Sequence, residues 1–448
     1  MVDVDKRAND NDADLPAGFK MTELGPLPEE WKVVKLGEIG EVTAGGSAPQ
    51  ERYYFNGRHP FVRVQHLDED GYWVRRWDLI TDEAVQAYRL RFFPKGTIVL
   101  PKSGASIRLE KRAVLPVDAY IVSHLCAVIP NSKAVDQRYL FYALKVRKFS
   151  SEKVEGYPTL NLSEIRNALI PLPPLSEQRA IAHVLRTVQR AKEATVQVIQ
   201  ATREMKKSLM RHLFTYGPVP VGEAERVPLK ETEVGLVPEH WKVQVLENVA
   251  SFVRDSLNPS NYPDEVFDYY SIPAYQETGS PILEVGKRIR SQKLVVEAND
   301  VLFGKLNPRI PKVLLVTASR RRKITSTEFI PLRASSRTVV PEYLYYLCWS
   351  NYVMRKAQEL VSGSTPSRQR VDVRAFLSLP VPLPPLSEQR EIVRILQSAD
   401  KKLQAEEARK QALEELFKTL LHNLMTGKIR AKDVVLPNVG EGKGDVTN

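Results

Sequence analysis

The residues best suited to chemistry in this sequence are basic and amide side chains in two short segments, each placed after a predicted strand. The first segment holds Lys102, Ser103, Ser106 and Arg108, and the second holds Lys305, Asn307 and Arg309. Lysine and arginine can neutralise phosphate or read guanine, and asparagine can pair with adenine through two hydrogen bonds. These side chains favour contact with DNA. Further candidates are Arg63, Gln65, Tyr157, Arg368, Gln369 and Arg370.

Motifs for catalysis or metal binding do not accompany these residues. The sequence contains no Asn/Asp-Pro-Pro-Tyr/Phe loop of an amino-methyltransferase, no GxxxxGK[ST] phosphate-binding loop, and no HExxH or GxSxG motif. The cysteines, Cys126 and Cys348, lie far apart in apolar contexts, and the seven histidines are scattered. We therefore expect no catalytic residue, no metal site, no disulfide and no cofactor bound by this chain.

The composition is that of a basic, folded protein. The 448 residues exceed the size of one typical core, which suggests two to four domains. A formal charge of +11 and a pI near 9.4 favour a polyanionic partner. The first twenty residues lack the apolar stretch of a signal peptide, and no segment is long and apolar enough to span a membrane. These features lead us to expect a cytoplasmic protein.

The elements that must position the candidate residues are arranged as two copies of one plan. The sequence PLPPLSEQR occurs at 171–179 and again, identical over nine residues, at 382–390. Upstream, residues 22–33 are related to 232–243 through the shared pattern Thr-Glu-x-Gly and Pro-Glu-x-Trp-Lys-Val. The segments between these ends differ, but both contain a turn leading into a strand, at 96–100 and 299–303.

The same skeleton continues beyond these strands. Residues 121–123 and 324–326 are predicted to begin a second strand, and 139–142 and 343–346 a helix. The sequence thus predicts mixed α+β domains that form a pseudo-twofold internal repeat. A shared scaffold with different loops is the pattern expected of two domains that recognise different targets. Duplication followed by drift also explains the difference between the loops.

Each PLPPLSEQR motif precedes a long predicted helix. Two prolines are followed by Ser176 or Ser387 as a plausible N-cap, and neither proline nor glycine occurs within 176–214 or 387–425. Each stretch of 39 residues corresponds to a helix of roughly 58 Å.

Apolar residues recur in both helices with sevenfold spacing, which predicts a coiled coil. Because the two helices are equal in length and a whole domain separates them in the sequence, we expect an antiparallel pair within the chain. The residues expected to pack between the helices are Ile181, Val184, Val188, Val198, Met205, Leu209, Ile392, Leu396, Leu403, Leu413, Phe417 and Leu420. Glu406 and Lys410 interrupt the second series. The alternative is that each helix packs only on its own domain. Paired helices of this length would hold two domains more than one turn of DNA apart, about 34 Å.

These elements divide the chain along the sequence. The expected segments are a disordered tail (1–20), a first recognition domain (21–172), a first helix (173–215), a linker (216–230), a second recognition domain (231–383), a second helix (384–427) and a C-terminal tail (428–448).

With these elements in place, the chain resembles the specificity subunits of type I restriction-modification systems. The resemblance covers about residues 23–430 and is carried by both copies of PLPPLSEQR, by the segments 27–31 and 237–241 that end in Trp31 and Trp241, and by the ending at 424–429. Tyr216 is extra relative to the second copy, and no Lys-Ile follows Gly217, which leaves the end of the first helix in doubt.

The resemblance implies a non-catalytic subunit with two target-recognition domains, each reading half of a split site on double-stranded DNA. It also implies two adenine-N6-methylating modification subunits, which bring S-adenosylmethionine, and ATP- and Mg-dependent restriction subunits. Three alternatives stay open: a related specificity protein that works with a fused methyltransferase-nuclease, a coiled-coil scaffold that binds only proteins, and a methyltransferase. The last would require the motifs that are missing.

Overall fold

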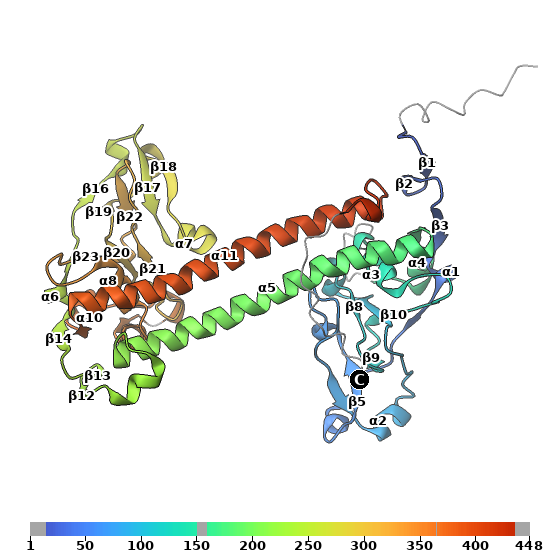
Figure 1. Cartoon of the computed structure of the whole chain (residues 1–448), viewed down its shortest axis with the longest axis horizontal. Helices are drawn as coiled ribbons and strands as arrows, with labels where there is room; N and C mark the ends of the chain where they lie inside the picture. Colours follow the sequence, from blue (N-terminus) through green and yellow to red (C-terminus); the bar gives the residue numbers. More distant parts are fainter. Residues whose placement is uncertain (1–14, 150–158, 364, 435–448) are drawn as a thin grey trace, which may run out of the picture. The chain divides into compact units, whose positions relative to one another are not determined.

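The structure is a computed structural model that describes residues 15–149, 159–363 and 365–434, arranged in two compact units. Unit 1 contains the described residues up to 196 together with 409–434, and unit 2 contains the described residues from 197 to 408. Two long helices, α5 (Leu175–Tyr216) and α11 (Leu386–Met425), run as uninterrupted ribbons, and each contributes residues to both units (Figure 1). The sequence-based division treated the helices as segments separate from the domains, whereas in the structure parts of both helices belong to each unit.

Unit 1 is built on two sheets. The antiparallel sheet contains, in spatial order, β4 (Gly40–Ala44), β10 (Leu125–Pro130), β7 (Ile98–Pro101) and β8 (Ala113–Val114). The mixed sheet contains β6 (Asp78–Ile80), β5 (His59–Val62) and β9 (Tyr120–Ile121), with β5 and β9 parallel. Strand β7 is buried on both faces because β-branched and leucine side chains fill it, so the loop that follows it starts from a fixed base.

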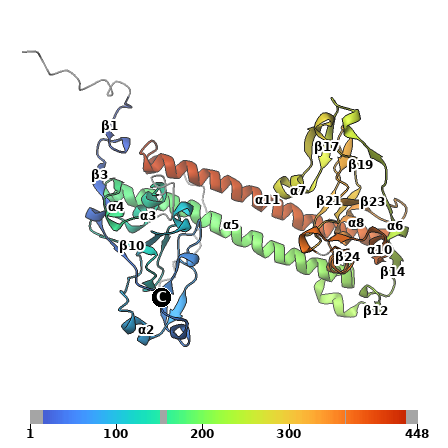
Figure 2. The same ribbon diagram turned by 180° about the vertical axis from the view of Figure 1, so that it is seen from behind.

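The smaller elements of unit 1 link these sheets to the long helices. They are the hairpin β1 (Phe19–Thr22) and β2 (Gly25–Pro28), the antiparallel pair β3 (Lys32–Lys35) and β11 (Leu169–Leu172), and the helices α1 (Leu36–Ile39), α2 (Asp82–Ala87), α3 (Gln137–Val146) and α4 (Leu162–Arg166). Figures 1 and 2 both place the β1–β2 hairpin at one end of this unit and strand β5 and helix α2 at the other.

Unit 2 repeats the antiparallel sheet of unit 1 strand for strand. In spatial order its strands are β15 (Ala250–Phe252), β23 (Phe329–Ala334), β20 (Val301–Gly304) and β21 (Val313–Leu315). The second sheet is larger, with β16 (Ser256–Leu257), β19 (Lys293–Val296), β22 (Lys323–Thr325), β17 (Val266–Tyr270) and β18 (Ile282–Val285). Strands β17 and β22 are parallel, as are β5 and β9 in unit 1. The internal repeat predicted from the sequence is thus a repeat of topology.

The remaining elements of unit 2 are smaller, and only some of them have counterparts in unit 1. They are β12 (Leu229–Thr232), β13 (Gly235–Pro238), β14 (Lys242–Val245), β24 (Val361–Ser362), β25 (Arg370–Val371), β26 (Pro380–Leu383), α6 (Leu246–Val249), α7 (Ile272–Thr278), α8 (Pro341–Cys348), α9 (Asn351–Glu359) and α10 (Val373–Leu377). Hairpin β12–β13 corresponds to β1–β2, pair β14–β26 to β3–β11, and helix α8 to α3. Ile121 and Ile324, expected to begin strands, instead lie at or near their ends.

Both long helices begin one residue earlier than predicted. Their first residues are Leu175 and Leu386, so Ser176 and Ser387 lie in the first turn and are not N-caps. The carbonyl oxygen of Pro174 accepts hydrogen bonds from the backbone N–H groups of Glu177 (2.9 Å) and Gln178 (3.0 Å). The proline itself therefore occupies the capping position, where its missing N–H costs nothing.

The two helices run antiparallel within each unit. In unit 1, Ile181, Val184 and Val188 of α5 share a buried cluster with Phe417 and Leu420 of α11, with Leu413 packed against it. In unit 2, Ile392 and Leu396 of α11 share a cluster with Leu213 of α5, with Leu209 packed against it. The first turns of each helix thus meet the last turns of the other. This contradicts the alternative in which each helix packs only on its own domain.

The predicted seam is wrong in the middle of α5. Val198 and Met205 are 39% and 49% exposed, whereas Ile199, one residue after Val198, is 6% exposed. Likewise Lys206, one residue after Met205, forms an ion pair with Asp400 of α11. Leu403 is half-buried. The inward-facing positions in this part of α5 are therefore Ile199 and Lys206, each one residue later than the predicted Val198 and Met205.

The predicted tails also need correction. Residues 1–14 and 435–448 lie outside the described residues. Phe19 already belongs to β1, although 1–20 was expected to be a disordered tail. Arg430, placed in the C-terminal tail, forms ion pairs with Glu177 at 2.7 Å and with Glu30 at 2.5 Å. Residues 428–434 are therefore an ordered part of unit 1.

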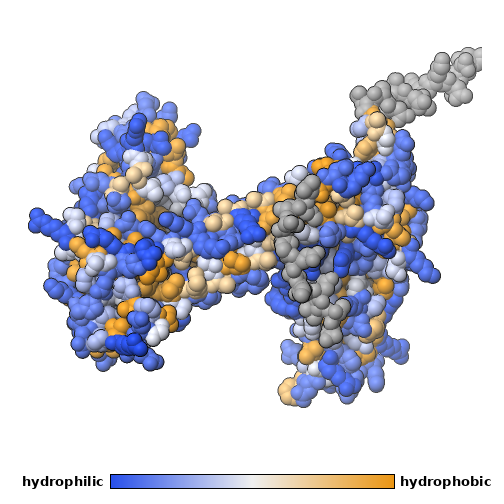
Figure 3. Space-filling model, in the orientation of Figure 1, coloured by the Kyte–Doolittle hydropathy of each residue, from blue (hydrophilic) through white to orange (hydrophobic). Residues whose placement is uncertain are grey.

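Hydrophilic residues cover most of the face of each unit drawn in Figure 3, with hydrophobic residues in smaller areas between them. Among the described residues, no helix has the length and hydropathy needed to cross a membrane.

Candidate nucleic-acid interface

In unit 2 the structure brings together the two loops that carry the predicted contact residues. The backbone N–H of Asn307 donates to the carbonyl of Gln369 (2.8 Å), and that of Val371 donates to the carbonyl of Lys305 (3.0 Å). Leu306 and Arg370 form an isolated antiparallel bridge. The loop after β20 and the loop before β25 therefore form one surface. Lys305, Asn307 and Arg309 reach it from the first loop, and Arg368, Gln369 and Arg370 from the second.

Unit 1 contains the same junction. The carbonyl of Lys102, directly after β7, accepts a hydrogen bond from the backbone N–H of Leu160 (2.8 Å), and Ser103 forms a bridge with Thr159. Lys102 and Lys305 thus occupy the same place in the two units, each with its carbonyl paired to a returning segment. Tyr157, predicted to contact DNA from that segment, lies outside the described residues.

Most of the predicted contact residues have side chains available to a ligand. Those that form no side-chain hydrogen bond or ion pair with another described residue are Gln65, Lys102, Arg108, Lys305, Asn307, Arg309 and Arg368. Gln65, Arg108, Arg309 and Arg368 are also exposed. Arginine and lysine contribute donors alone, whereas glutamine and asparagine contribute both donors and acceptors. The surface can therefore bind phosphate and can also distinguish base edges.

Asn307 has a backbone conformation that fixes the turn. Its φ is +47°, in the left-handed region that asparagine tolerates better than most residues. The carbonyl of Asn307 accepts a hydrogen bond from the N–H of Ile310 (3.1 Å), which closes a tight turn around Pro308 and Arg309. Arg309 is thus exposed at the tip of an ordered turn.

Arg370 and Arg63 differ from the other candidates because their guanidinium groups are already bound. The Nε and Nη2 atoms of Arg370 donate to Glu328 at 3.0 Å, and its Nη1 donates to the carbonyl of Arg368 at 3.2 Å. The Nε of Arg63 lies 2.8 Å from Asp78, and its guanidinium lies over the ring of Tyr54. Both arginines hold their own loops in place. For both, DNA contact stays a prediction that requires these pairs to open.

The remaining candidates have local partners. The hydroxyl of Ser106 donates to the carbonyl of Ser103 (3.2 Å), and the Gln369 amide donates to the carbonyl of Gly363 (3.4 Å). Arg63 and Gln65 directly follow β5, a strand of the second sheet of unit 1, and a residue at the end of the loop that begins at Lys102 contacts the same segment. The ammonium of Lys111 donates to the carbonyl of Leu67 at 3.0 Å, directly after the short helix that contains Gln65.

The identical PLPPLSEQR motifs anchor each domain to its helix. The carboxylate of Glu177 accepts a hydrogen bond from the indole of Trp31 (3.0 Å), and that of Glu388 accepts one from Trp241 (2.8 Å). Both tryptophans are fully buried. Arg430 adds an ion pair to Glu177, whereas His240 lies 2.6 Å from Glu388. The same contact in both copies gives this segment a shared structural role, which the differing loops do not have.

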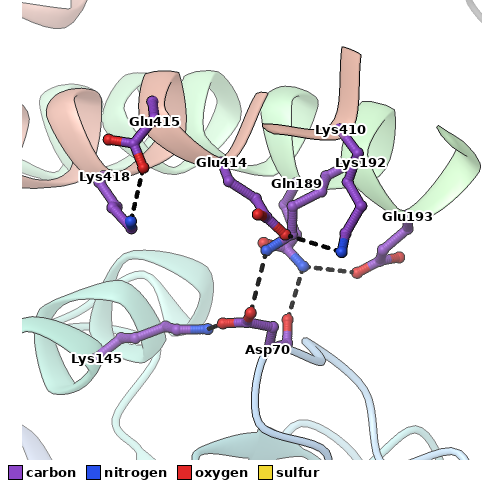
Figure 4. A network of polar contacts seen from close by, with 9 residues as sticks. All are labelled: Asp70, Lys145, Gln189, Lys192, Glu193, Lys410, Glu414, Glu415 and Lys418. Atoms are coloured by element: carbon purple, nitrogen blue, oxygen red, sulfur yellow. Dashed lines mark hydrogen bonds and ion pairs between the residues drawn. The ribbon is translucent and has the colours of Figure 1, made fainter. Parts of the chain in front are cut away.

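A polar network joins the Asp70 loop of unit 1 to helices α3 and α5 (Figure 4). Asp70 lies 3.3 Å from the ammonium of Lys145 on α3 and 3.5 Å from that of Lys192 on α5, and its carbonyl accepts a hydrogen bond from Gln189 at 2.8 Å. Both ammonium groups also lie within 6 Å of the ring of Phe417 on α11. Burial opposes ionisation of Asp70, but the two lysines outweigh it and lower the pKa of the carboxyl.

Unit 2 achieves the same anchoring with different side chains. Asp400 on α11 accepts a hydrogen bond from the hydroxyl of Tyr346 on α8 (2.7 Å) and forms an ion pair with Lys206 on α5. The ammonium of Lys206 also lies 5.5 Å from the centre of the Tyr346 ring. Three elements of unit 2 therefore meet at one carboxylate.

We expect Asp70→Asn to destabilise unit 1 in a pH-dependent way. Because the folded pKa of Asp70 is lowered, its contribution is present at neutral pH and is lost as the pH falls through that pKa. The Asp70 side chain is largely exposed, so we expect a loss of about 1 kcal/mol at pH 7. Urea unfolding at pH 7 and pH 3 should show the difference shrinking at low pH. Glu69→Gln, next to it and exposed, is the control, and an equal effect of both variants at pH 7 contradicts the role of Asp70.

Within the described ranges, no group of three or more histidine, cysteine, aspartate or glutamate side chains is placed to hold a metal ion. Burial raises the pKa of the Cys126 and Cys348 thiols to about 12, which makes both poor nucleophiles at neutral pH. The surface described above is built from backbone-ordered loops and basic side chains.

Comparison with known proteins agrees with this description. The family described as "Type I restriction modification DNA specificity domain" matches residues 28–201 and again 238–415. Over 433 residues the chain is 25% identical to the putative type I restriction enzyme MjaX specificity subunit of Methanocaldococcus jannaschii, covering 92% of this chain and 97% of that protein. It is 21% identical over 393 residues to the EcoKI specificity subunit of Escherichia coli, covering 83% and 82%.

A solved structure has the same fold. The crystal structure of the type I restriction-modification system S subunit from M. genitalium aligns with a TM-score of 0.57 at 16% identity, over 88% of this chain and 96% of that one. The two family matches fall on the two repeats, and each includes the β7–Lys102 or β20–Lys305 junction. The chain therefore belongs to the family of type I restriction-modification DNA specificity proteins and carries two copies of their specificity domain.

Proposed function

We propose that the two loop surfaces read separate halves of one bipartite DNA site. The chain is a type I specificity subunit, which recognises DNA and performs no catalysis itself. The observation that carries the proposal is the repeated junction after β7 and β20, where equivalent lysines and different neighbouring side chains stand on the same backbone frame. A shared frame gives both loops the same approach to DNA, and different side chains give them different sequences.

The side chains suit this division of work. Lys102 and Lys305, at the base of each loop, are placed to bind phosphate and set the position of the domain. Asn307, Arg309 and Arg368 have the donors and acceptors needed for adenine and guanine edges in the major groove. Gln65 and Arg108 are the corresponding candidates in unit 1.

We further propose that the paired helices set the spacer between the half-sites and bind the methyltransferase subunits. The starts of α5 and α11 are anchored to their domains in the same way, which supports binding of two copies of the same partner. This partner would be an adenine-N6 modification subunit that supplies S-adenosylmethionine. Restriction subunits that use ATP and Mg²⁺ would join this core. The relatives' names, which describe them as subunits of type I restriction enzymes, support such an assembly.

Reciprocal substitutions test the two-reader proposal. We expect Lys305→Ala to weaken recognition of one half-site and Lys102→Ala to weaken the other, each by about tenfold, because each lysine belongs to one loop surface. Binding of the full chain with its modification subunits is measured on duplexes altered in one half-site at a time. Lys401→Ala, which removes an exposed charge from α11, is the control. Equal loss at both half-sites in either variant contradicts the proposal.

A scaffold that binds only proteins would behave differently. Release of counterions makes DNA binding weaken steeply with salt, so the protein should be retained on duplex DNA at low salt and released as the salt rises. If the protein is held equally well on the same matrix without DNA, with or without a modification subunit, the result favours the scaffold.

A further inference from the structure

A buried lysine organises the recognition loop of unit 2. Lys312, directly before β21, is 4% exposed, and its ammonium donates hydrogen bonds to three backbone carbonyls of the loop. The acceptors are Leu306 (3.0 Å), Asn307 (3.3 Å) and Ile310 (2.6 Å). An ammonium has three N–H donors and no acceptor, so these carbonyls use its full capacity.

The position of the ammonium determines which way the loop faces. Three carbonyls within residues 306–310 are turned inward to one point, and the turn of Asn307 leaves Arg309 and Ile310 exposed. The carbonyl of Asn307 accepts from both the Lys312 ammonium and the N–H of Ile310. Lys312 therefore acts on the same turn that presents Arg309.

The sequence around Lys312 accommodates its long side chain. Gly304 lies opposite on β20, and a Cβ atom there would come within 2.9 Å of the Lys312 Cβ. The methylene stem of Lys312 thus packs where a larger residue would displace it. Burial lowers the pKa of the Lys312 ammonium, because removal from water disfavours its charged form.

We propose that Lys312 is a positioning residue for DNA recognition, which holds the 306–310 loop in the shape that reads the second half-site. This inference rests on the proposed function. It adds a specificity determinant that touches no base, because the ammonium is buried and bound to backbone. Loss of the ammonium would leave three carbonyls without a donor and allow the loop to adopt other shapes.

A second buried lysine of the same unit provides a matched control. Lys323 is 8% exposed, and its ammonium donates to the carbonyls of Ser319 (2.9 Å) and Arg321 (3.1 Å). It begins β22, and the turn it holds precedes that strand. Glu328, which contacts Lys305 and Arg370, follows β22. Lys323 is therefore also a buried lysine bound to backbone carbonyls, but it lies at the end of β22 that is away from the recognition loops.

The test compares Lys312→Met with Lys323→Met in the full chain bound to its modification subunits. Binding is measured on the cognate duplex and on duplexes with one base pair changed in either half-site. We expect both variants to lose thermal stability. Only Lys312→Met should lose most of its discrimination at the second half-site, a drop of about tenfold or more, with discrimination at the first half-site unchanged.

Lys312→Gln is a second, milder variant, which keeps the test informative if Lys312→Met fails to fold. Its shorter neutral side chain cannot reach all three carbonyls, so we expect a folded protein with a smaller loss at the same half-site. Full discrimination by a folded Lys312→Met or Lys312→Gln protein overturns the positioning role, as does an equal loss in Lys323→Met. A wild-type complex that is insensitive to changes in both half-sites contradicts the proposed function instead.

Discussion

Gln389→Ala should lower the free energy of unfolding by about 3 kcal/mol, because it leaves one buried and two partly buried backbone groups without their side-chain partner. The Gln389 side chain is fully buried at the start of α11. Its amide donates to the carbonyls of Thr338 and Pro384, both at 2.9 Å, and its oxygen accepts from the N–H of Val340 at 2.9 Å. Since α8 begins at Pro341, this one side chain joins the start of α8 to the start of α11. Urea unfolding of the full chain measures the loss.

The equivalent residue in unit 1 gives an internal comparison. Gln178 donates to the carbonyl of Pro173 (2.8 Å) and accepts from the N–H of Asp136 (2.8 Å), so Gln178→Ala should cost about 2 kcal/mol, somewhat less than Gln389→Ala. Gln404→Ala, on the exposed face of α11, should change stability by less than about 0.5 kcal/mol. If Gln389→Ala is as stable as Gln404→Ala, the identity of the two motifs has another cause.

Insertion of one heptad into both long helices should lengthen the DNA spacer by about three base pairs without altering either half-site. Seven residues preserve the buried face of each helix and add about 10 Å of length, and successive base pairs are about 3.4 Å apart. The insertions belong near Arg203 and Glu407, whose ion pair of 2.7 Å marks facing positions in unit 2. Sequencing of methylated adenines in a host that carries the intact system reads out the new site.

The control inserts the heptad into α5 alone. The facing side chains of the two helices then no longer match, and we expect loss of the methylated site instead of a longer one. An unchanged spacer in the double insertion, with methylation retained, rules out the helices as the measure of spacer length.

Periodicity and the equal lengths of the two stretches predicted the long helices and their antiparallel pairing, but periodicity did not settle the register of the packed residues. Val184 and Leu185 are both apolar, as are Val198 and Ile199, so sevenfold spacing fits either series. At the next repeat the sequence favoured Met205 over Lys206, and the structure places Lys206 against Asp400 and Tyr346. Lys206 faces inward because its charge has a partner, Asp400, on the other helix. The sequence of one helix alone does not reveal this partner.

The candidate site was predictable in composition but not in its connections. The repeat placed Lys102 and Lys305 correctly at equivalent positions, and the loops near 307 and 369 were both selected for their basic and amide residues. Their contact, through Asn307 and Gln369, joins segments about sixty residues apart and left no local pattern. Glu328 and Asp78, which bind Arg370 and Arg63, were missed for the same reason. Lys312 was missed because a lysine before a strand is ordinarily solvated.

The assembly of unit 1 from two distant stretches of chain affects the order in which the protein can fold during synthesis. Residues 197–408, which make up unit 2, are translated before the 409–425 stretch that covers Ile181, Val184 and Val188. At about 5–20 residues per second this interval lasts roughly 10–40 s. Throughout it, the nascent chain presents an uncovered apolar stripe on α5, a surface on which chaperones act and from which misassembly begins.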